Sequence, residues 1–402
     1  MEPPILHRLS KNLLTWIILA IILGALLGKV LPSAAIVPFA TFNDIFGKFL
    51  SFVVPLIIVG LVAPAISDLG KSGGRWVILT VALGYCSTVI AGLGTWGLAT
   101  VVYPWLLAGQ KVSDVETPEL AVPSLMDASF TLPPVFGVLT ALILAFLLGF
   151  GAVATNAHKI ISLMHEFREI IYTIIKRSIV PLLPLFVFGT FLNMSKSGQF
   201  EQVVVLMAKV IAFAFVLTVI MLLFQYFIAG SLARRNPFIA LWNMRDAYAT
   251  ALGTASSAAT IPVTLRSARK NGVSEDVAGF VIPLCATIHL AGSTIKITAF
   301  ALALQYMLGI THPAATMVSF IFMLGIIMVA APGVPGGAIT AAQSVVQGIL
   351  GFTEPMYGIM IALYVAVDSF GTATNVTGDG AIAMIVERLS SGKQKAKKHS
   401  VR

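Results

Sequence analysis

The stretch AVDSFGTATNVTGDGA places acidic, amide and hydroxyl side chains between two apolar runs. Asp368, Thr372, Asn375 and Asp379 fall at i, i+4, i+7 and i+11, so they share one face of a helix. A charged side chain at mid-bilayer costs about 2.5–3.5 kcal/mol, and such residues usually face an internal site. Two carboxylates with an amide and a hydroxyl can bind an ammonium group and a hard cation, which prefers oxygen ligands. The alternative is a purely structural polar stripe between helices.

The composition is that of a membrane protein. Of 402 residues, 57% are hydrophobic and 11% are charged, whereas about 25% are charged in soluble domains. Several apolar runs reach the roughly 20 residues that a helix needs to cross a bilayer, so we expect an all-α polytopic membrane protein. The chain shows no Walker loop, Ser/His/Asp triad or metal-ligand motif, and its two cysteines, Cys86 and Cys285, lie in apolar segments. We therefore expect neither an enzyme nor a resident cofactor.

Apolar runs predict six N-terminal spans, at residues 12–31, 45–66, 76–105, 134–154, 172–194 and 203–230. The loop 106–133 is acidic, which places it outside. Basic residues explain the net charge of +9 and gather in the other connections and at the start of the run 172–194: Arg8, Lys11, Lys71, Arg75, Lys159, Arg168, Lys176, Arg177, Arg234, Arg235 and the tail 389–402. Alternation from a cytoplasmic N-terminus puts all of them inside, as the positive-inside rule requires. We therefore expect both termini to be cytoplasmic and the basic residues to be orientation signals, with no nucleic-acid partner.

Two further segments are predicted to enter the membrane and return. Residues 236–265 have arginines on both flanks and a centre of small and hydroxyl residues. Residues 316–350 are broken by AAPGVPGGA. Broken backbone at membrane depth is tolerated where it is buried in protein or lines a cavity, and paired interrupted segments point to a transporter's binding site. Two kinked ordinary helices are the alternative.

Two more helices, at about 276–304 and 355–388, complete a prediction of eight transmembrane helices and two re-entrant hairpins. His289, Ser293 and Lys296 fall at i, i+4 and i+7, so we expect them to share a helix face. A lysine within a span should face protein or water. A buried histidine with satisfied hydrogen bonds is the alternative for His289.

Four motifs carry a resemblance to a known family. SSAATIP (256–262), PLCATIHLAGS (283–293), PGVPGGA (332–338) and NVTGD (375–379) resemble the signature regions of the dicarboxylate/amino acid:cation symporter family, which has the glutamate-transporter fold. The resemblance covers the whole chain and implies a homotrimer in the plasma membrane (in bacteria, the inner membrane). It also implies a transport domain that moves like an elevator against a scaffold. It divides the chain into six N-terminal helices (1–230, scaffold plus helices 3 and 6), a transport core (231–388) and a basic tail (389–402).

The resemblance also implies roles for individual residues. The substrate α-amino group is assigned to Asp368. The rest of the substrate site is assigned to Ser256, Ser257, Ser293, Gly333, Val334, Pro335, Gly336, Gly371, Thr372 and Asn375. Sodium is the implied coupling ion, and its ligands are assigned to Asp379, Asn375, His289, Cys285 and Thr287, with Leu290 near a second site. Tyr85 and Thr88 resemble residues near a third site.

Departures from the family pattern suggest the substrate. Gly371 leaves an open space where acidic-substrate members have an arginine, the residue suited to bidentate carboxylate binding. This favours a small neutral amino acid such as serine, threonine or alanine. Ala291 replaces an aspartate and Leu290 a methionine, which argues against a third sodium site and weakens the second. Lys296 either replaces a lost cation or meets an acidic substrate from a new direction.

Two main hypotheses follow. The first is a sodium-coupled symporter of neutral α-amino acids. The alternative is a proton-coupled or acidic amino acid/dicarboxylate symporter that uses His289 and Lys296, since a histidine titrates near pH 6.5 when unperturbed. The presence of Asp368 favours amino acids over carboxylates that lack an amino group, because an anion without an ammonium group gains nothing from facing a carboxylate.

Overall fold

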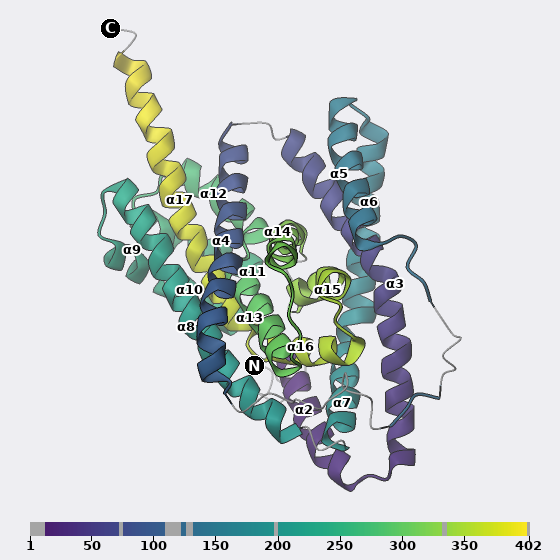
Figure 1. Ribbon diagram of the computed structural model, residues 1–402. Helices are drawn as coiled ribbons and strands as arrows, with labels where there is room; N and C mark the ends of the chain where they lie inside the picture. The colour runs from purple at the N-terminus through teal and green to yellow at the C-terminus, as the bar shows by residue number, and fades with distance from the viewer. Residues whose placement is uncertain are drawn as a thin grey trace, which may run out of the picture.

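The structure is a computed structural model that describes residues 13–71, 75–108, 122–125, 132–196, 200–331 and 336–399. Within those ranges the chain is helical and contains no strand (Figure 1). Of the predicted site residues, Gly333, Val334 and Pro335 lie outside the described residues. So do Arg8, Lys11 and most of the acidic loop 106–133.

The N-terminal half consists of long apolar helices. They are α2 (Leu13–Val30), α3 (Ser33–Lys71), α4 (Arg75–Leu106), α5 (Val138–Ala154), α6 (His158–Ile174), the π-helical turn η1 (Ile175–Ile179), α7 (Val180–Lys196) and α8 (Phe200–Ala233). The helix that contains the predicted span 172–194 begins earlier than that span, because α6, η1 and α7 form one continuous run from His158 to Lys196. The reason is that α6 is amphipathic. It buries Ile161, Met164 and Ile171 on one face, which stabilises a helix although its other face is polar, and so extends the run towards the N-terminus.

The C-terminal half is made of shorter, interrupted helices. They are α9 (Pro237–Asn243), α10 (Arg245–Thr254), α11 (Ser257–Lys270), α12 (Glu275–Ile288), α13 (Ala291–Met307), α14 (Ala314–Ala330), α15 (Gly337–Leu350), α16 (Glu354–Ala366) and α17 (Asp368–His399). The helices α10 and α11 pack against each other across a short tip, and α14 packs against α15. These pairs coincide with the two segments predicted as hairpins, although α11 runs five residues past the predicted end at 265.

Among the residues that the structure describes, five helical runs are long and apolar enough to cross a bilayer: Ser33–Asp68, Trp76–Leu106, His158–Lys196, Met207–Ala233 and Glu275–Met307. A sixth is obtained if α16 and α17, which meet at an angle of 62°, form one broken span. Length and composition therefore support a polytopic membrane protein.

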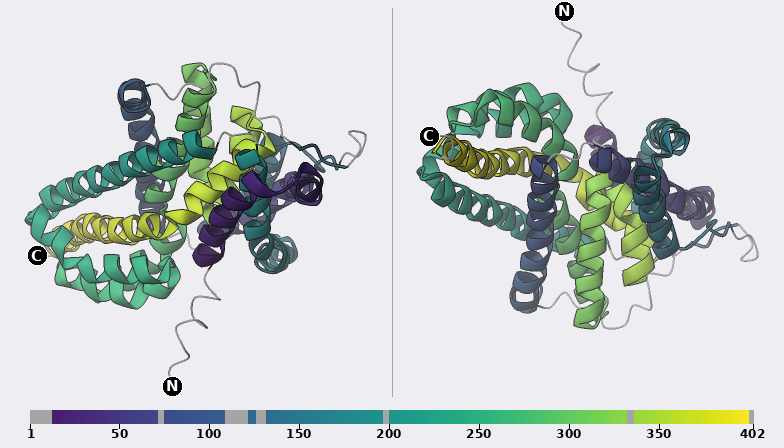
Figure 2. Two further views of the ribbon diagram at one scale, coloured as in Figure 1. Left: turned by 90° about the horizontal axis from the view of Figure 1, so that it is seen from below. Right: turned by 90° about the horizontal axis from the view of Figure 1, so that it is seen from above.

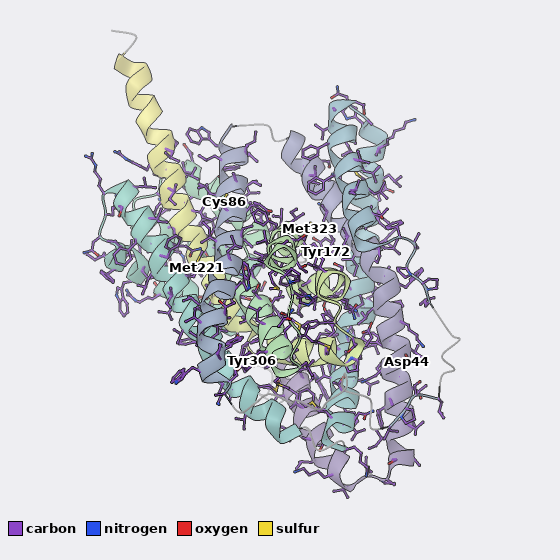
Figure 3. The ribbon with its side chains drawn as sticks, viewed as in Figure 1. Asp44, Cys86, Tyr172, Met221, Tyr306 and Met323 are labelled. Carbon is purple, nitrogen blue, oxygen red and sulfur yellow. The ribbon has the colours of Figure 1, made fainter. Side chains whose placement is uncertain are left out.

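The helices pack in two groups. In the first, α3 packs against α5, α6 and α7, and α2 packs against α7. In the second, α17 runs between α8 on one side and α10 and α11 on the other (Figure 2). The helix α13 packs against α17, and α4 packs against both α13 and α17, so α4 and α13 belong to the second group. On α4 the Cys86 side chain is exposed (Figure 3), whereas Cys285 on α12 is buried.

Candidate functional site

The predicted polar stripe lies on one helix in the interior of the protein. Asp368 is the first residue of α17, directly after the bend at Val367. It is buried, as are Thr372, Asn375 and Asp379. The Thr372 hydroxyl donates to the Asp368 carbonyl at 3.2 Å, within the helix. The stripe therefore faces protein along its whole length.

The predicted continuous helix 276–304 is interrupted, and this corrects the shared face predicted for His289, Ser293 and Lys296. His289 has extended backbone angles (φ −106°, ψ 99°), so only Ser293 and Lys296 lie on α13. The break is stabilised from α17, because the Asn375 side-chain oxygen accepts a hydrogen bond from the Gly292 N–H at 2.8 Å. That donor lies in the first turn of α13, where N–H groups have no partner within the helix.

Asn375 and Ser293 form a small buried network with a tyrosine. The Ser293 hydroxyl oxygen accepts from the Asn375 amide nitrogen at 3.2 Å and from the Tyr364 hydroxyl at 2.9 Å. Gly292 and Gly371 are also in close contact, since a Cβ on Gly292 would lie 2.6 Å from the Gly371 carbonyl oxygen. These contacts hold the start of α13 tightly against α17.

A buried lysine faces the first carboxylate of the stripe. The Lys296 ammonium lies 3.4 Å from Asp368 Oδ1 and donates to the carbonyls of Val367 and Asp368, both at 3.2 Å. It also lies over the Tyr364 ring, 3.9 Å from the centroid, in cation–π geometry. The other carboxylate oxygen of Asp368 accepts from the Gly336 N–H at 2.9 Å. Asp368 therefore connects α13 with the tip between α14 and α15.

The open space predicted at Gly371 is filled. A Cβ at this position would lie 2.3 Å from Lys296 Cε and 2.4 Å from its Nζ. The glycine thus makes room for the end of the lysine side chain, which enters from α13. The prediction treated α17 alone and could not show that a cation from another helix occupies this place.

The second carboxylate also faces a basic residue. Asp379 Oδ1 lies 2.9 Å from His289 Nδ1, and both side chains are buried. The other ring nitrogen, Nε2, lies 3.0 Å from the Ser87 hydroxyl and 3.2 Å from the Gln225 amide nitrogen. A neutral imidazole with its proton on Nδ1 fits this set, because it donates to the carboxylate and accepts from the Ser87 hydroxyl, which in turn accepts from the Gln225 amide at 2.8 Å.

Protein side chains alone do not form a metal cluster there. Across the described ranges, no three His, Cys, Asp or Glu side chains are grouped so that they could hold a metal ion. A cation at Asp379 would need backbone and amide oxygens to complete its shell, and hard cations accept such ligands.

The tip between α10 and α11 contains the predicted serines. Ser256 is the N-cap of α11, and its hydroxyl oxygen accepts from the Ala259 N–H at 3.3 Å. Ser257 is buried. Ala255, just before them, has left-handed backbone angles (φ 47°), which reverse the chain. Because α10 and α11 both pack against α17, this tip belongs to the same group of helices as the stripe.

The remaining residues predicted to bind sodium do not all lie in the network around Asp379. Cys285 is buried, and its carbonyl accepts from the His289 N–H at 2.9 Å. Thr287 lies outside the Asp379 network: it is exposed, and its hydroxyl donates to the Leu284 carbonyl. On α4, Thr88 is buried and donates to the Gly84 carbonyl, while the Tyr85 hydroxyl donates to the Phe322 carbonyl on α14. Leu290 is partly buried at the start of α13.

Sequence reasoning missed three residues that contact the predicted site: Ser87, Gln225 and Tyr364. Gln225 had a usable signal, because an amide within the apolar run MLLFQYF should face protein. Ser87 lies between Tyr85 and Thr88 in the GYCST segment, but it was not predicted as a site residue. Tyr364 had no signal, since tyrosines are common in membrane helices.

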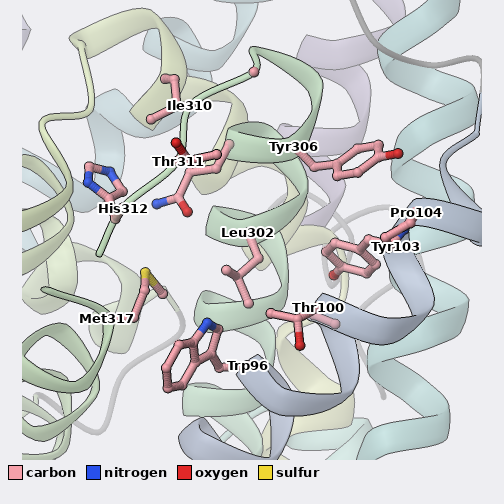
Figure 4. A pocket seen from close by; sticks show the side chains of 13 residues that line it. Trp96, Thr100, Tyr103, Pro104, Leu302, Tyr306, Ile310, Thr311, His312 and Met317 are labelled. Carbon is pink, nitrogen blue, oxygen red and sulfur yellow. The ribbon is translucent and has the colours of Figure 1, made fainter. Parts of the chain in front are cut away.

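A separate pocket of about 350 Å³ lies beyond Lys296 along α13 (Figure 4). Its lining comes from α4, from the end of α13, from the connection to α14 and from the start of α14, and includes Trp96, Tyr103, Gln305, Tyr306, His312 and Met317. None of the predicted site residues lines it. We therefore do not include it in the candidate site.

Comparison with known proteins agrees with the four motifs. The chain is 29% identical over 394 residues to the serine/threonine transporter SstT of Acinetobacter baumannii strain AYE. The matched region covers 92% of this chain and 94% of that protein. The SstT proteins of strains AB307-0294 and ATCC 17978 match with the same identity and coverage. A family model described as the sodium:dicarboxylate symporter family matches residues 13–389. The chain therefore belongs to the sodium:dicarboxylate symporter family.

Proposed function

We propose that this protein is a secondary active symporter that imports a small neutral α-amino acid, such as serine, threonine or alanine, together with sodium. Family membership and the likeness to serine/threonine transporters support amino acid symport. The observation on which the proposal chiefly rests is Asp368, a buried carboxylate beside the tip between α14 and α15. A carboxylate in this place suits an ammonium group and disfavours an anion that lacks one.

The architecture proposed with it has eight transmembrane helices and two re-entrant hairpins. The N-terminal region 1–230 would supply the scaffold, and 231–388 the transport core, with a cytoplasmic tail at 389–402. Packing supports the assignment of α4 and α8 to the moving part, because α4 contacts α13 and α8 contacts α17. In the proposal, the transport core moves as an elevator within each subunit of a homotrimer in the plasma membrane, with both termini cytoplasmic.

Substrate would bind across three elements. Its ammonium group would bind Asp368, and its carboxylate would approach the Ser256–Ser257 tip and Asn375. The Gly336 N–H that donates to Asp368 lies at the tip of the pair α14–α15, which would act as the outer gate. Opening of this gate would break that hydrogen bond, and binding of the substrate ammonium would compensate Asp368 for its loss.

Sodium would bind near Asp379. His289 must give up its contact with Asp379 Oδ1 or share it, because that carboxylate is already engaged at 2.9 Å. Coupling requires that substrate and cation each stabilise the same closed state. Asn375 connects the two places, since its oxygen contacts Gly292 beside His289 while its nitrogen contacts Ser293.

A second candidate function is supported by Lys296. Its ammonium fills the place beside Gly371 where acidic-substrate members of the family have an arginine. A symporter of acidic amino acids or dicarboxylates could use this cation for the second carboxylate of its substrate.

The experiment that separates these functions is uptake by proteoliposomes. Radiolabelled serine, threonine, alanine, aspartate and succinate are supplied with imposed sodium or proton gradients, each applied alone. Uptake of serine, threonine or alanine driven by sodium supports the main proposal. Preference for aspartate or succinate contradicts it and favours the second candidate, and uptake driven only by protons contradicts sodium coupling.

A further inference from the structure

Lys296 is a buried cation for which the transport scheme above has no use. Its side chain is 2% exposed. Its contacts are long for a charged donor: 3.2 Å to each carbonyl and 3.4 Å to the Asp368 carboxylate, whereas charge-assisted N–H···O bonds are typically about 2.7–2.9 Å. The ammonium is therefore close to its counter-ion without a tight, bidentate pairing.

The charges at this place balance only for certain ligands. Lys296 and Asp368 together are neutral, and a buried charge that loses its partner is strongly destabilising. A zwitterion adds one positive and one negative group, so each group of the ligand can pair with one residue. An amine without a carboxylate would leave two cations sharing Asp368. An acidic amino acid would add a negative charge with no partner in this pair.

The geometry suits a ligand whose two charges are close together. In an α-amino acid the ammonium and the carboxylate are attached to one carbon, so they can reach two opposite charges only when these are neighbours, as Lys296 and Asp368 are. The missing Cβ at Gly371 is what allows the Lys296 ammonium to lie beside Asp368, because a Cβ there would be 2.4 Å from Lys296 Nζ. The Tyr364 ring lies against the Lys296 ammonium and can stabilise this cation when its contact with Asp368 is replaced by one with the substrate.

We propose that Lys296 is a specificity-determining residue that adds a positive charge to the binding of the substrate α-carboxylate by the Ser256–Ser257 tip and Asn375, while Asp368 binds the α-ammonium, so that a zwitterionic amino acid inserts into the Lys296–Asp368 pair. This inference rests on the proposed function, because it requires an amino acid substrate. It assigns the buried cation to the group common to all amino acids. The second candidate function instead assigns it to an acidic side chain.

The test compares L-serine with L-serinamide at about pH 6, below the α-amino pKa of about 7.7–8.0, so that serinamide keeps the α-ammonium and replaces the carboxylate by a neutral amide of similar shape. Affinities are measured on purified protein by ligand-induced thermal stabilisation and by competition with radiolabelled serine. We expect the wild-type protein to bind serine at least 100-fold more tightly than serinamide. In Lys296→Met the ratio falls at least tenfold, because serine loses its counter-ion and serinamide does not.

Lys209→Met is the matched control, since the Lys209 ammonium donates to the Leu106 carbonyl in another part of the protein. This variant should keep the wild-type ratio, and loss of the ratio here as well would contradict a specific role of Lys296. Should Lys296→Met fail to fold, Lys296→Gln, which keeps a long polar side chain without the charge, is measured in the same way, and an unchanged serine-to-serinamide ratio in it overturns the inference.

The outcomes also distinguish the inference from the function on which it rests. A wild-type protein that neither binds nor transports serine, threonine or alanine overturns both. Serine uptake with an unchanged serine-to-serinamide ratio in Lys296→Met overturns the inference alone. Aspartate that binds more tightly than serine in the wild type, and loses this advantage in Lys296→Met, assigns Lys296 to the side-chain carboxylate and also overturns it.

Discussion

Three glycine-to-alanine substitutions test the packing between α13 and α17. Gly279 on α12 is open, since a Cβ there would meet no atom within 4 Å. Gly371 faces the flexible end of Lys296, and Gly292 faces backbone atoms of Gly371. Each variant adds the same methyl group to a helix. Differences in stability therefore report what the methyl group meets.

The expected magnitudes follow from the contact distances. Gly279→Ala should stabilise the protein by about 0.5–1 kcal/mol, the usual gain from glycine to alanine in a helix. In Gly371→Ala the Cβ would lie 2.3 Å from Lys296 Cε, whereas carbon atoms prefer about 3.5 Å or more. The lysine end must therefore move by roughly 1.2 Å, and overpacking of this kind costs about 1–3 kcal/mol.

Part of that cost is electrostatic. A movement directed away from Asp368 lengthens the 3.4 Å contact to about 4.6 Å, and at an effective dielectric constant of about 20 this weakens the attraction by about 1 kcal/mol. Gly292→Ala should cost the most, because its Cβ would lie 2.6 Å from the Gly371 carbonyl oxygen and 2.8 Å from the Thr374 Cβ. Neither group is the end of a flexible side chain, so we expect about 3 kcal/mol or more.

The buried Cys285 thiol provides the assay. In a Cys86→Ser background, which removes the exposed thiol, a thiol-reactive dye labels Cys285 only as the protein unfolds on heating. We expect the midpoint to decrease in the order Gly279→Ala, wild type, Gly371→Ala, Gly292→Ala. Equal midpoints for the Gly279 and Gly371 variants would refute the position of Lys296 beside Gly371. In a Lys296→Ala background the penalty of Gly371→Ala should disappear, as a double-mutant cycle would show.

Further predictions concern the two acid–base pairs. Asp379→Asn should abolish the dependence of uptake on sodium, measured over a range of sodium concentrations, and unchanged sodium dependence would contradict the assignment of the cation to this residue. His289→Ala removes the hydrogen bond to the buried Asp379 carboxylate and should cost about 1.5–3 kcal/mol, seen as a lower midpoint in the same thermal assay; a midpoint equal to that of the wild type would mean that the hydrogen bond is not formed. Tyr364→Phe removes the hydroxyl that donates to Ser293 and should cost about 1 kcal/mol, whereas Tyr364→Leu also removes the ring over Lys296 and should destabilise more. Equal midpoints for the two Tyr364 variants would show that the ring does not stabilise the ammonium.

The sequence predicted much of the local structure. Membrane character follows from composition and apolar run length, because the bilayer imposes both. The broken segments around Ser256 and around residues 332–336 were visible because glycine, proline and small residues interrupt apolar runs. The stripe from Asp368 to Asp379 was visible because helical spacing puts these residues on one face.

Periodicity was a poor guide where other helices decide the backbone. The break at His289 depends on Asn375, which accepts from the Gly292 N–H across 83 residues of sequence. The sequence around His289 reads as an uninterrupted apolar helix, so a continuous face with Ser293 and Lys296 was the natural prediction. The long run from His158 was missed for the opposite reason, because its polar N-terminal part does not read as membrane.

The sequence by itself determined which residue types are available: two carboxylates on one helix, a glycine on the same face, and a histidine and a lysine on the segment before α14. Only the tertiary structure decided how they pair. Lys296 faces Asp368 across Gly371, and His289 faces Asp379. The physical reason is that a buried charge takes its partner from whichever helix packs against it. That choice depends on the crossing of α13 and α17 and on the break between α12 and α13, which spacing along one helix does not specify.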